Sequence, residues 1–216
     1  MKPEDLMCTV NSDDVLIERK VVVFFDICSS TKILEELKQT DNLEYWRSFL
    51  IFLKNCIDDD GKRLGMKPYK FLGDGWILLF PPTVRLPDLY DFLFSMCTGF
   101  DSHFDCTVLP LLQKRPDPLG LTFGVDSGEL VKTQMHGREE YLGRAINLAA
   151  RLQGATKVVS KNNNYGNTVL FSKHSFNSLD TSGPEGEVPM HVNPVKVPLK
   201  NIISGEEYEC FWSRVL

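Results

Sequence analysis

Two aspartates have the residue type and the sequence context of metal ligands. Asp26 lies near the end of an unbroken apolar run, Lys20 to Ile27, and Asp74 lies between Gly73 and Gly75. A carboxylate at the end of a buried strand is costly unless something binds it, whereas an Asp flanked by glycines is also a common turn residue. Each residue alone therefore fits a structural role. Together they could hold two divalent cations about 3.5–4 Å apart, as two-metal phosphoryl-transfer sites do.

The residues directly after Asp26 carry hydroxyl groups where the strand is expected to turn into a helix. Ser29, Ser30 and Thr31 supply N-cap chemistry for a helix through Lys38. The backbone N–H groups at the start of a helix point outward and favour phosphate. An ordinary serine cap explains the same residues, so this segment alone does not identify a phosphate site.

A second polar pair lies on the helix predicted over residues 140–154, which is entered through Gly143. Asn147 and Arg151 are four residues apart, so they share one face of that helix. An amide and a guanidinium on an otherwise apolar helix need partners. These are either a nearby carboxylate, such as Glu129 or Asp126, or the ribose and phosphate oxygens of a nucleotide, where Arg can stabilise developing charge.

The elements that must position these side chains alternate between hairpins and helices. Apolar patterning predicts strands over residues 20–27, 69–80, 119–131, 168–171, 195–199 and 207–212, with hairpin turns in the second and third of these segments. It predicts helices over residues 43–57 and 86–104, the first ended by 58–61, and a loop over 182–194. We expect one domain, residues 1–216 with a core at about 20–212, in the α+β class. The order favours an antiparallel sheet with helices on one face, a ferredoxin-like βαββαβ core and additional C-terminal strands.

The composition is that of a folded protein in which acidic residues outnumber basic ones. The 216 residues are 43% hydrophobic and 25% charged, and 29 acidic against 24 basic residues give a net charge of -5. This balance argues against a nucleic-acid partner but permits a single nucleotide whose charge metal ions neutralise. Six cysteines without a C-x-x-C pair, and a polar start, indicate free thiols in the cytoplasm. No apolar stretch reaches the roughly 20 residues of a membrane span, so we expect no membrane association.

Three segments resemble the core signatures of class III nucleotidyl cyclases. They are F-F-D-I-C-S-S-T at 24–31, K-F-L-G-D-G at 70–75 and G-R-A-I-N-L-A-A-R-L at 143–152, and G-V-D-S-G-E-L at 124–130 resembles the family's strand before the last motif. The resemblance covers roughly residues 21–211. It implies an enzyme, a lyase that converts a nucleoside triphosphate into a 3′,5′-cyclic monophosphate and pyrophosphate.

The resemblance also implies a role for each matching residue. Asp26 and Asp74 would hold two Mg²⁺ or Mn²⁺ ions per active site, with the backbone carbonyl of Ile27 as a further ligand. Asn147 would orient the ribose, and Arg151 would stabilise the transition state at the α-phosphate. In the family these two groups come from opposite subunits of a head-to-tail dimer. A symmetric homodimer with two sites is therefore implied, and a monomer should be inactive.

The residues that would read the base leave its identity open. Lys70 falls where adenylyl cyclases carry a base-reading lysine, and Glu140 falls near the second base-reading position. A Lys donor with a carboxylate acceptor suits adenine, cytosine or uracil, and the family's pattern speaks against guanine. Tyr45 or Trp46 falls where purine cyclases line the pocket with small residues, so a large ring there would favour a pyrimidine.

The segment E-Y-L-G-R-A-I-N-L-A-A-R-L-Q and the bare catalytic layout resemble the pyrimidine cyclases of bacterial anti-phage signalling, the Pycsar type. Their cyclic UMP or cyclic CMP activates a separate effector protein. We therefore expect a pyrimidine cyclase of antiviral defence, with UTP favoured and CTP second, and an adenylyl cyclase as the alternative. A non-catalytic nucleotide binder and a two-metal phosphodiesterase are further hypotheses. The family's phosphate-binding lysine has no clean match, and Lys196 and Lys200 stay open.

Overall fold

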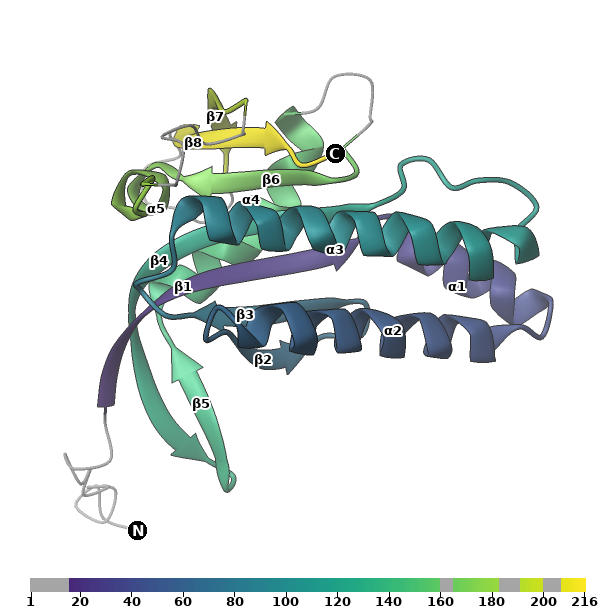
Figure 1. Cartoon of the computed structure of the whole chain (residues 1–216), viewed down its shortest axis with the longest axis horizontal. Coiled ribbons are helices and arrows are strands. Elements are labelled where there is room, and N and C mark those ends of the chain that lie inside the picture. Colours follow the sequence, from purple (N-terminus) through teal and green to yellow (C-terminus); the bar gives the residue numbers. More distant parts are fainter. Residues whose placement is uncertain (1–15, 160–164, 183–190, 200–206) are drawn as a thin grey trace, which may run out of the picture.

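One mixed sheet organises the computed structural model, which describes residues 16–159, 165–182, 191–199 and 207–216 (Figure 1). In this described part the strand order is β2-β3-β1-β4-β6-β8-β7, and β5 pairs with the outer half of β4. The strands are β1 (Leu16–Ile27), β2 (Lys67–Phe71), β3 (Gly75–Phe80), β4 (Leu121–Met135), β5 (Arg138–Leu142), β6 (Thr168–Ser172), β7 (Asn193–Pro198) and β8 (Glu207–Arg214).

The first four strands form the predicted ferredoxin-like core. Their spatial order is β4-β1-β3-β2, and α2 (Leu43–Lys62) and α3 (Leu86–Thr107) provide the two core helices. The predicted α+β class is confirmed, and β7 and β8 are the predicted C-terminal additions. The pairs are antiparallel except β4 with β6, which are parallel because α4 (Arg144–Val159) crosses between them.

Helices cover both faces of the sheet, so the prediction of helices on one face is wrong. The side chains of Val21, Val23 and Phe25 join the core under α1 (Ser30–Gln39), α2 and α3. The side chain of Val22 points the other way and packs with residues of α4. Figure 1 shows α2 and α3 in front of the sheet and α4 behind it. The unbroken apolar run of β1 has this cause, because a strand covered on both faces needs apolar residues at every position.

The hairpin predicted within residues 119–131 does not exist, because β4 runs without interruption from Leu121 to Met135. The turn lies later, at His136 and Gly137, whose φ angles of 52° and 72° belong to the left-handed region. Gly128, which falls within the predicted hairpin, lies under α4, where an added Cβ would be 3.5 Å from the Cβ of Ala145, an ordinary van der Waals distance.

Several element boundaries also differ from the prediction. Residues 58–61 do not end α2, which continues to Lys62, and Gly61 lies where a Cβ would collide with the side chain of Met66. Glu140 belongs to β5, and α4 begins only at Arg144. The short helix α5 (Lys173–Ser178) was not predicted. The loop predicted over 182–194 falls partly on residues 183–190, which lie outside the described residues, and its last two residues belong to β7.

The described cysteines are all free thiols, and Cys8 lies outside the described residues. Among the helices that the structure describes, none has both the length and the apolar character that crossing a bilayer requires.

Candidate functional site

The strands β1 and β3 bring the two predicted metal-binding aspartates together. Asp26 is the next-to-last residue of β1, and it pairs with Gly75, which directly follows Asp74 in the β2–β3 turn. A Cβ at Gly75 would collide with the carbonyl oxygen of Phe25 and lie 3.2 Å from Asp26 Oδ1. The glycine after Asp74 therefore allows the turn to approach the end of β1, and the turn role and the site role of this segment coincide.

The two carboxylates repel each other in a partly buried place. Burial raises the pKa of Asp26 to about 6, the negative charge of Asp74 adds to this rise, and a backbone hydrogen bond from Ile27 opposes it. The Ser30 hydroxyl donates a hydrogen bond to Asp74 Oδ2 and so orients that carboxylate. A cation between the two carboxylates would relieve their repulsion.

The aspartate pair offers carboxylate oxygens, which are the donors that Mg²⁺ and Mn²⁺ prefer. Within the described residues no cluster of three or more His, Cys, Asp or Glu side chains could hold a metal. Two carboxylates alone leave most coordination positions to carbonyl groups, water and phosphate oxygens. Mg²⁺ is commonly bound in this way, through one or two carboxylates and substrate phosphates. The carbonyl of Ile27 as a ligand stays a prediction.

The predicted serine cap of α1 is absent. Ser29 adopts a left-handed conformation, φ 59°, and makes no side-chain hydrogen bond to the helix. Its hydroxyl donates instead to the carbonyl of Pro118, at 2.9 Å. Ser30 is turned toward Asp74, and Thr31 is exposed. The start of α1 therefore lies next to the aspartate pair, and Ser29 does not cover its N–H groups.

The second polar pair lies on the outward face of α4. Asn147 is exposed and Arg151 is partly exposed, whereas the inward face of the helix is apolar. The helix lies directly on β4, because a Cβ at Gly124 would collide with the Ala149 carbonyl oxygen and the Gln153 nitrogen. Asn147 thus points away from the sheet that carries the aspartates, and a second molecule can reach it.

The two predicted base-reading residues form an ion pair. Lys70 Nζ lies 2.6 Å from Glu140 Oε2, and this contact raises the pKa of Lys70 and lowers the pKa of Glu140. Tyr69, which the sequence analysis missed, donates its hydroxyl to the same carboxylate oxygen at 2.5 Å and accepts from the Tyr141 N–H at 2.8 Å. A register shift between Pro68 and Lys70 explains how two successive residues of β2 reach one carboxylate.

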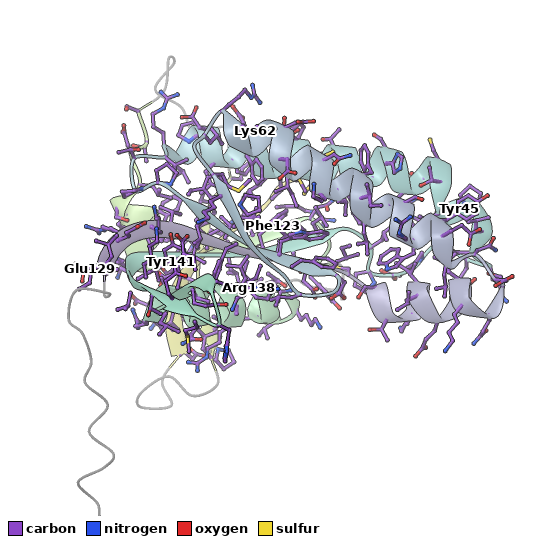
Figure 2. The ribbon with its side chains drawn as sticks, turned by 90° about the horizontal axis from the view of Figure 1, so that it is seen from below. Tyr45, Lys62, Phe123, Glu129, Arg138 and Tyr141 are labelled. Carbon is purple, nitrogen blue, oxygen red and sulfur yellow. The ribbon has the colours of Figure 1, made fainter. Side chains whose placement is uncertain are left out.

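A groove of about 750 Å³ lies between α2 and β2, and Lys70 is one of its lining residues. Trp46 lines it and is only 6% exposed, whereas Tyr45 does not line it and is 43% exposed. Figure 2 shows Tyr45 near the start of α2, remote from Tyr141, which follows Glu140 on β5. Of the two rings considered for the base pocket, only Trp46 therefore shares a cavity with Lys70. The apolar side chains beside it include those of Leu50, Phe71 and Trp76.

No protein-family model and no curated protein sequence matches this chain. Solved structures do match it, and adenylyl and guanylyl cyclases are among them. The guanylyl cyclase Cya2 has a TM-score of 0.66 and 20% identity, and the match covers 92% of each chain. The adenylyl cyclase CyaB from P. aeruginosa has a TM-score of 0.66 and 17% identity over 92% of this chain and 95% of that one.

A bacterial light-regulated adenylyl cyclase matches with a TM-score of 0.65 and 15% identity over 91% of this chain. The match covers 52% of that protein, so the present chain spans about half its length. At these identities the likeness shows the fold. The fold of adenylyl and guanylyl cyclase domains is therefore the fold of this chain.

Proposed function

We propose that this chain is a nucleotidyl cyclase that uses two divalent cations to convert a nucleoside triphosphate into a 3′,5′-cyclic monophosphate and pyrophosphate. The main support is the pair Asp26 and Asp74, which β1 and β3 hold together at partial burial although their charges repel. Two carboxylates held together against their repulsion are the arrangement that a cation-binding site needs. The fold of known cyclase domains is independent support.

The reaction joins the ribose 3′-oxygen to the α-phosphorus and breaks the bond from that phosphorus to the oxygen bridging to the β-phosphate. Pyrophosphate leaves with the electron pair of the broken bond, and the hydroxyl proton passes to water. Bound Mg²⁺ or Mn²⁺ would supply charge neutralisation and activate the hydroxyl. Asp26 and Asp74 hold the cations, Asn147 orients the ribose, and Arg151 stabilises the charge that develops on the α-phosphate.

The site is completed by a second copy of the chain. Asn147 lies on the outward face of α4, away from the sheet that carries Asp26. A symmetric dimer places this face of one protomer over the aspartates of its partner, and the same operation forms a second site. The homodimer is therefore the active form, and the monomer is inactive.

The base is a pyrimidine, with uracil favoured and cytosine second. The ammonium of Lys70 can donate to the O4 of uracil, and the carboxylate of Glu140 can accept its N3–H. The same two groups can pair with N1 and N6 of adenine, so adenine is the alternative. The indole ring of Trp46, in the groove next to Lys70, supports the smaller base. We further propose that the product activates a separate effector protein in anti-phage defence in the cytoplasm.

We first expect the wild-type protein, and not a variant of the aspartate pair, to form a cyclic nucleotide. Purified protein is incubated with ATP, GTP, CTP and UTP separately in Mn²⁺, and the products are identified by mass spectrometry. We expect a cyclic pyrimidine monophosphate from the wild type. Asp74→Ala should give none, because it removes half of the carboxylate pair, and the exposed control Asp59→Ala should behave as wild type.

If cyclic AMP is the main product, the proposed mechanism stands and the proposed pyrimidine preference is wrong. The absence of any cyclic product from dimeric protein, even after addition of lysate from phage-infected cells, would contradict the enzymatic proposal. A linear or hydrolysed product would favour a two-metal phosphodiesterase instead.

Replacing Trp46 with a smaller residue should change the base preference of the enzyme, whereas the same replacement of its neighbour Tyr45 should not. Trp46→Leu is expected to raise the ratio of kcat/KM for ATP over UTP about tenfold or more, since pocket size discriminates by about 1–3 kcal/mol. Tyr45→Leu should leave the ratio unchanged, because Tyr45 does not line the groove. Thermal unfolding must be measured in parallel, since Trp46 stacks on Phe49 at 5.6 Å between ring centroids. An unchanged ratio in a folded Trp46→Leu protein would refute the pocket argument.

A further inference from the structure

Lys157 is a cation beside the aspartate pair to which the proposed function gives no task. It lies in the last turn of α4, four residues after Gln153, whose side chain is linked through Thr122 to the backbone carbonyl of Asp26. Its ammonium is 5.8 Å from the centroid of the Tyr165 ring. Lys157, Tyr165 and the end of β1 therefore share one neighbourhood.

Buried hydrogen bonds fix this end of α4 relative to Asp26. Gln153 Nε2 donates to Thr122 Oγ1 at 2.8 Å, and Thr122 Oγ1 donates to the backbone carbonyl of Asp26 at 3.3 Å. Gln153 and Thr122 are both buried. Lys157 follows Gln153 by four residues, so it lies on the same face of the helix, about 6 Å further along its axis.

The direction of α4 carries Lys157 past the end of β1. Near its start, Ala145 lies against Gly128, and further along Gln153 lies against Gly124. The helix thus runs antiparallel to β4, from the middle of that strand toward its first residue. Because Asp26 pairs with Thr122 near the start of β4, the next turn of the helix brings Lys157 to the edge of the sheet where β1 ends.

Lys157 and the start of α1 flank the aspartates from opposite faces of the sheet. α1 packs through Ile33 and Leu37 into the core shared with α2 and α3, whereas α4 packs on the other face. A triphosphate that lies across the end of β1 would meet the N–H groups of α1 on one side and an ammonium on the other. Backbone N–H groups and a lysine are a recurrent pair of phosphate ligands.

The charge balance of the site leaves room for this cation. A nucleoside triphosphate carries about four negative charges, and two divalent cations held by two carboxylates compensate about two of them. The remainder needs basic side chains. Lys196 lies on β7, the edge strand at the far end of the sheet from β2, and Lys200 lies outside the described residues. Among the lysines that the structure describes, Lys157 lies one helical turn beyond Gln153, whose side chain is linked through Thr122 to the backbone carbonyl of Asp26.

We infer that Lys157 binds the β- and γ-phosphates of the triphosphate substrate, and the pyrophosphate product, from the same chain that holds the metal ions. This inference rests on the proposed function and deepens it, since it assigns the phosphate-binding lysine that the sequence left open. The competing explanation is that Lys157 stacks on Tyr165 and merely offsets the charge of the two aspartates. The two explanations differ in the triphosphate affinity they predict when the ammonium is removed: binding weakens if Lys157 holds the phosphates, and stays equal or tightens if Lys157 only offsets the aspartates.

The test compares Lys157→Met with wild type by calorimetry in Mn²⁺. The probes are 3′-deoxyuridine triphosphate, with 3′-deoxyadenosine triphosphate alongside, because both lack the attacking hydroxyl and cannot be cyclised. We expect Lys157→Met to weaken the binding of the triphosphate and of pyrophosphate about tenfold, and to leave the binding of uridine monophosphate unchanged. Lys157→Arg should keep most of the affinity. Lys173→Met, whose lysine pairs with Glu209 near the opposite edge of the sheet, is the matched control.

Binding of Mn²⁺ alone, followed by the electron paramagnetic resonance signal of the free ion, separates the two roles. Loss of a positive charge beside two carboxylates should keep or tighten Mn²⁺ binding while triphosphate binding weakens. A lysine that only offset the aspartates would give tighter or equal binding of both, and that result would overturn the inference. If the wild type cyclises and Lys157→Met binds triphosphate equally well, this inference alone fails. If the wild type neither binds triphosphate nor makes a cyclic product, the proposed function fails with it.

Discussion

Asp26→Asn is expected to lower kcat at least about a thousandfold without destabilising the protein. The carboxylate holds the cations that supply several kcal/mol of transition-state stabilisation, and each 1.36 kcal/mol is about a factor of ten in rate. Above pH 6, however, the ionised Asp26 is unfavourable for folding, because burial and the charge of Asp74 raise its pKa to about 6. The amide has nearly the same shape and no charge. Cyclic nucleotide formation and urea unfolding of the same preparation measure the two effects.

The pH dependence of unfolding determines whether Asp26→Asn stabilises or destabilises the folded protein. Since the pKa of Asp26 is raised from about 3.8 to about 6 in the folded protein, the folded state holds that proton more tightly than the unfolded chain. The stability from Asp26 is therefore fully present below pH 3.8 and is lost as pH rises toward 6. In metal-free protein with a chelator, we expect Asp26→Asn to be about 1–2 kcal/mol more stable than wild type at pH 7.5, after allowance for solvent screening. The difference should disappear near pH 3.5.

The exposed residue Asp59 supplies the control, since Asp59→Asn should change neither the rate nor the pH dependence. An Asp26→Asn protein that keeps its activity would remove Asp26 from the metal site. One that unfolds at clearly lower urea at pH 7.5 would show that the carboxylate is there for the fold. A functional carboxylate that reduces stability is what a site selected for activity is expected to contain.

Local patterns in the sequence predicted those parts of the fold whose cause is local. The apolar run of β1 and the G-D-G turn between β2 and β3 were confirmed, and they place Asp26 and Asp74 together. A glycine can also be required by a tertiary contact, and the spacing of residues in the sequence does not reveal this. Gly61 was placed in the segment that ends the helix, but it lies inside α2, where a Cβ would collide with the side chain of Met66. A glycine needed for a tertiary contact looks the same in the sequence as a glycine needed for a turn.

The placement of the candidate site residues was predictable where one element carries them and was missed where two elements cross. Asn147 and Arg151 share a helix face by spacing alone, and α4 confirms it. Tyr69 was missed because a register shift in β2 turns it toward Glu140. Lys157 was missed because its place near Asp26 depends on how α4 crosses β4. Such a crossing angle is set by packing between distant segments, to which no short pattern corresponds.

Mixing two inactive variants is expected to restore about a quarter of the wild-type activity. Asp26→Asn removes the metal half of each site, and Arg151→Ala removes the transition-state half. In a mixture at equal amounts, half of the dimers combine one chain of each kind. Such a dimer has one site with both halves intact and one site with both halves lost. Half of the dimers with half of their sites active gives about a quarter of the activity, measured as cyclic nucleotide per total protein.

Pairs of variants on the same half of the site are the controls. Asp26→Asn mixed with Asp74→Ala should stay inactive, because each mixed site still lacks one metal-binding carboxylate. Asn147→Ala mixed with Arg151→Ala should recover no more than either variant alone. Native mass spectrometry must show the mixed dimer in every case. Mixed dimers of Asp26→Asn and Arg151→Ala without activity would place both halves in one chain.

Recovery to a quarter would decide more than the oligomeric state. It would show that the outward face of α4, where Asn147 is exposed, closes over the aspartates of the partner, so that each chain contributes a different half of the chemistry. It would also fix which chain supplies Lys157. If Lys157 acts from the metal-holding chain, Lys157→Met should be complemented by Arg151→Ala and not by Asp26→Asn. The two mixtures thus assign each basic residue to its half of the site.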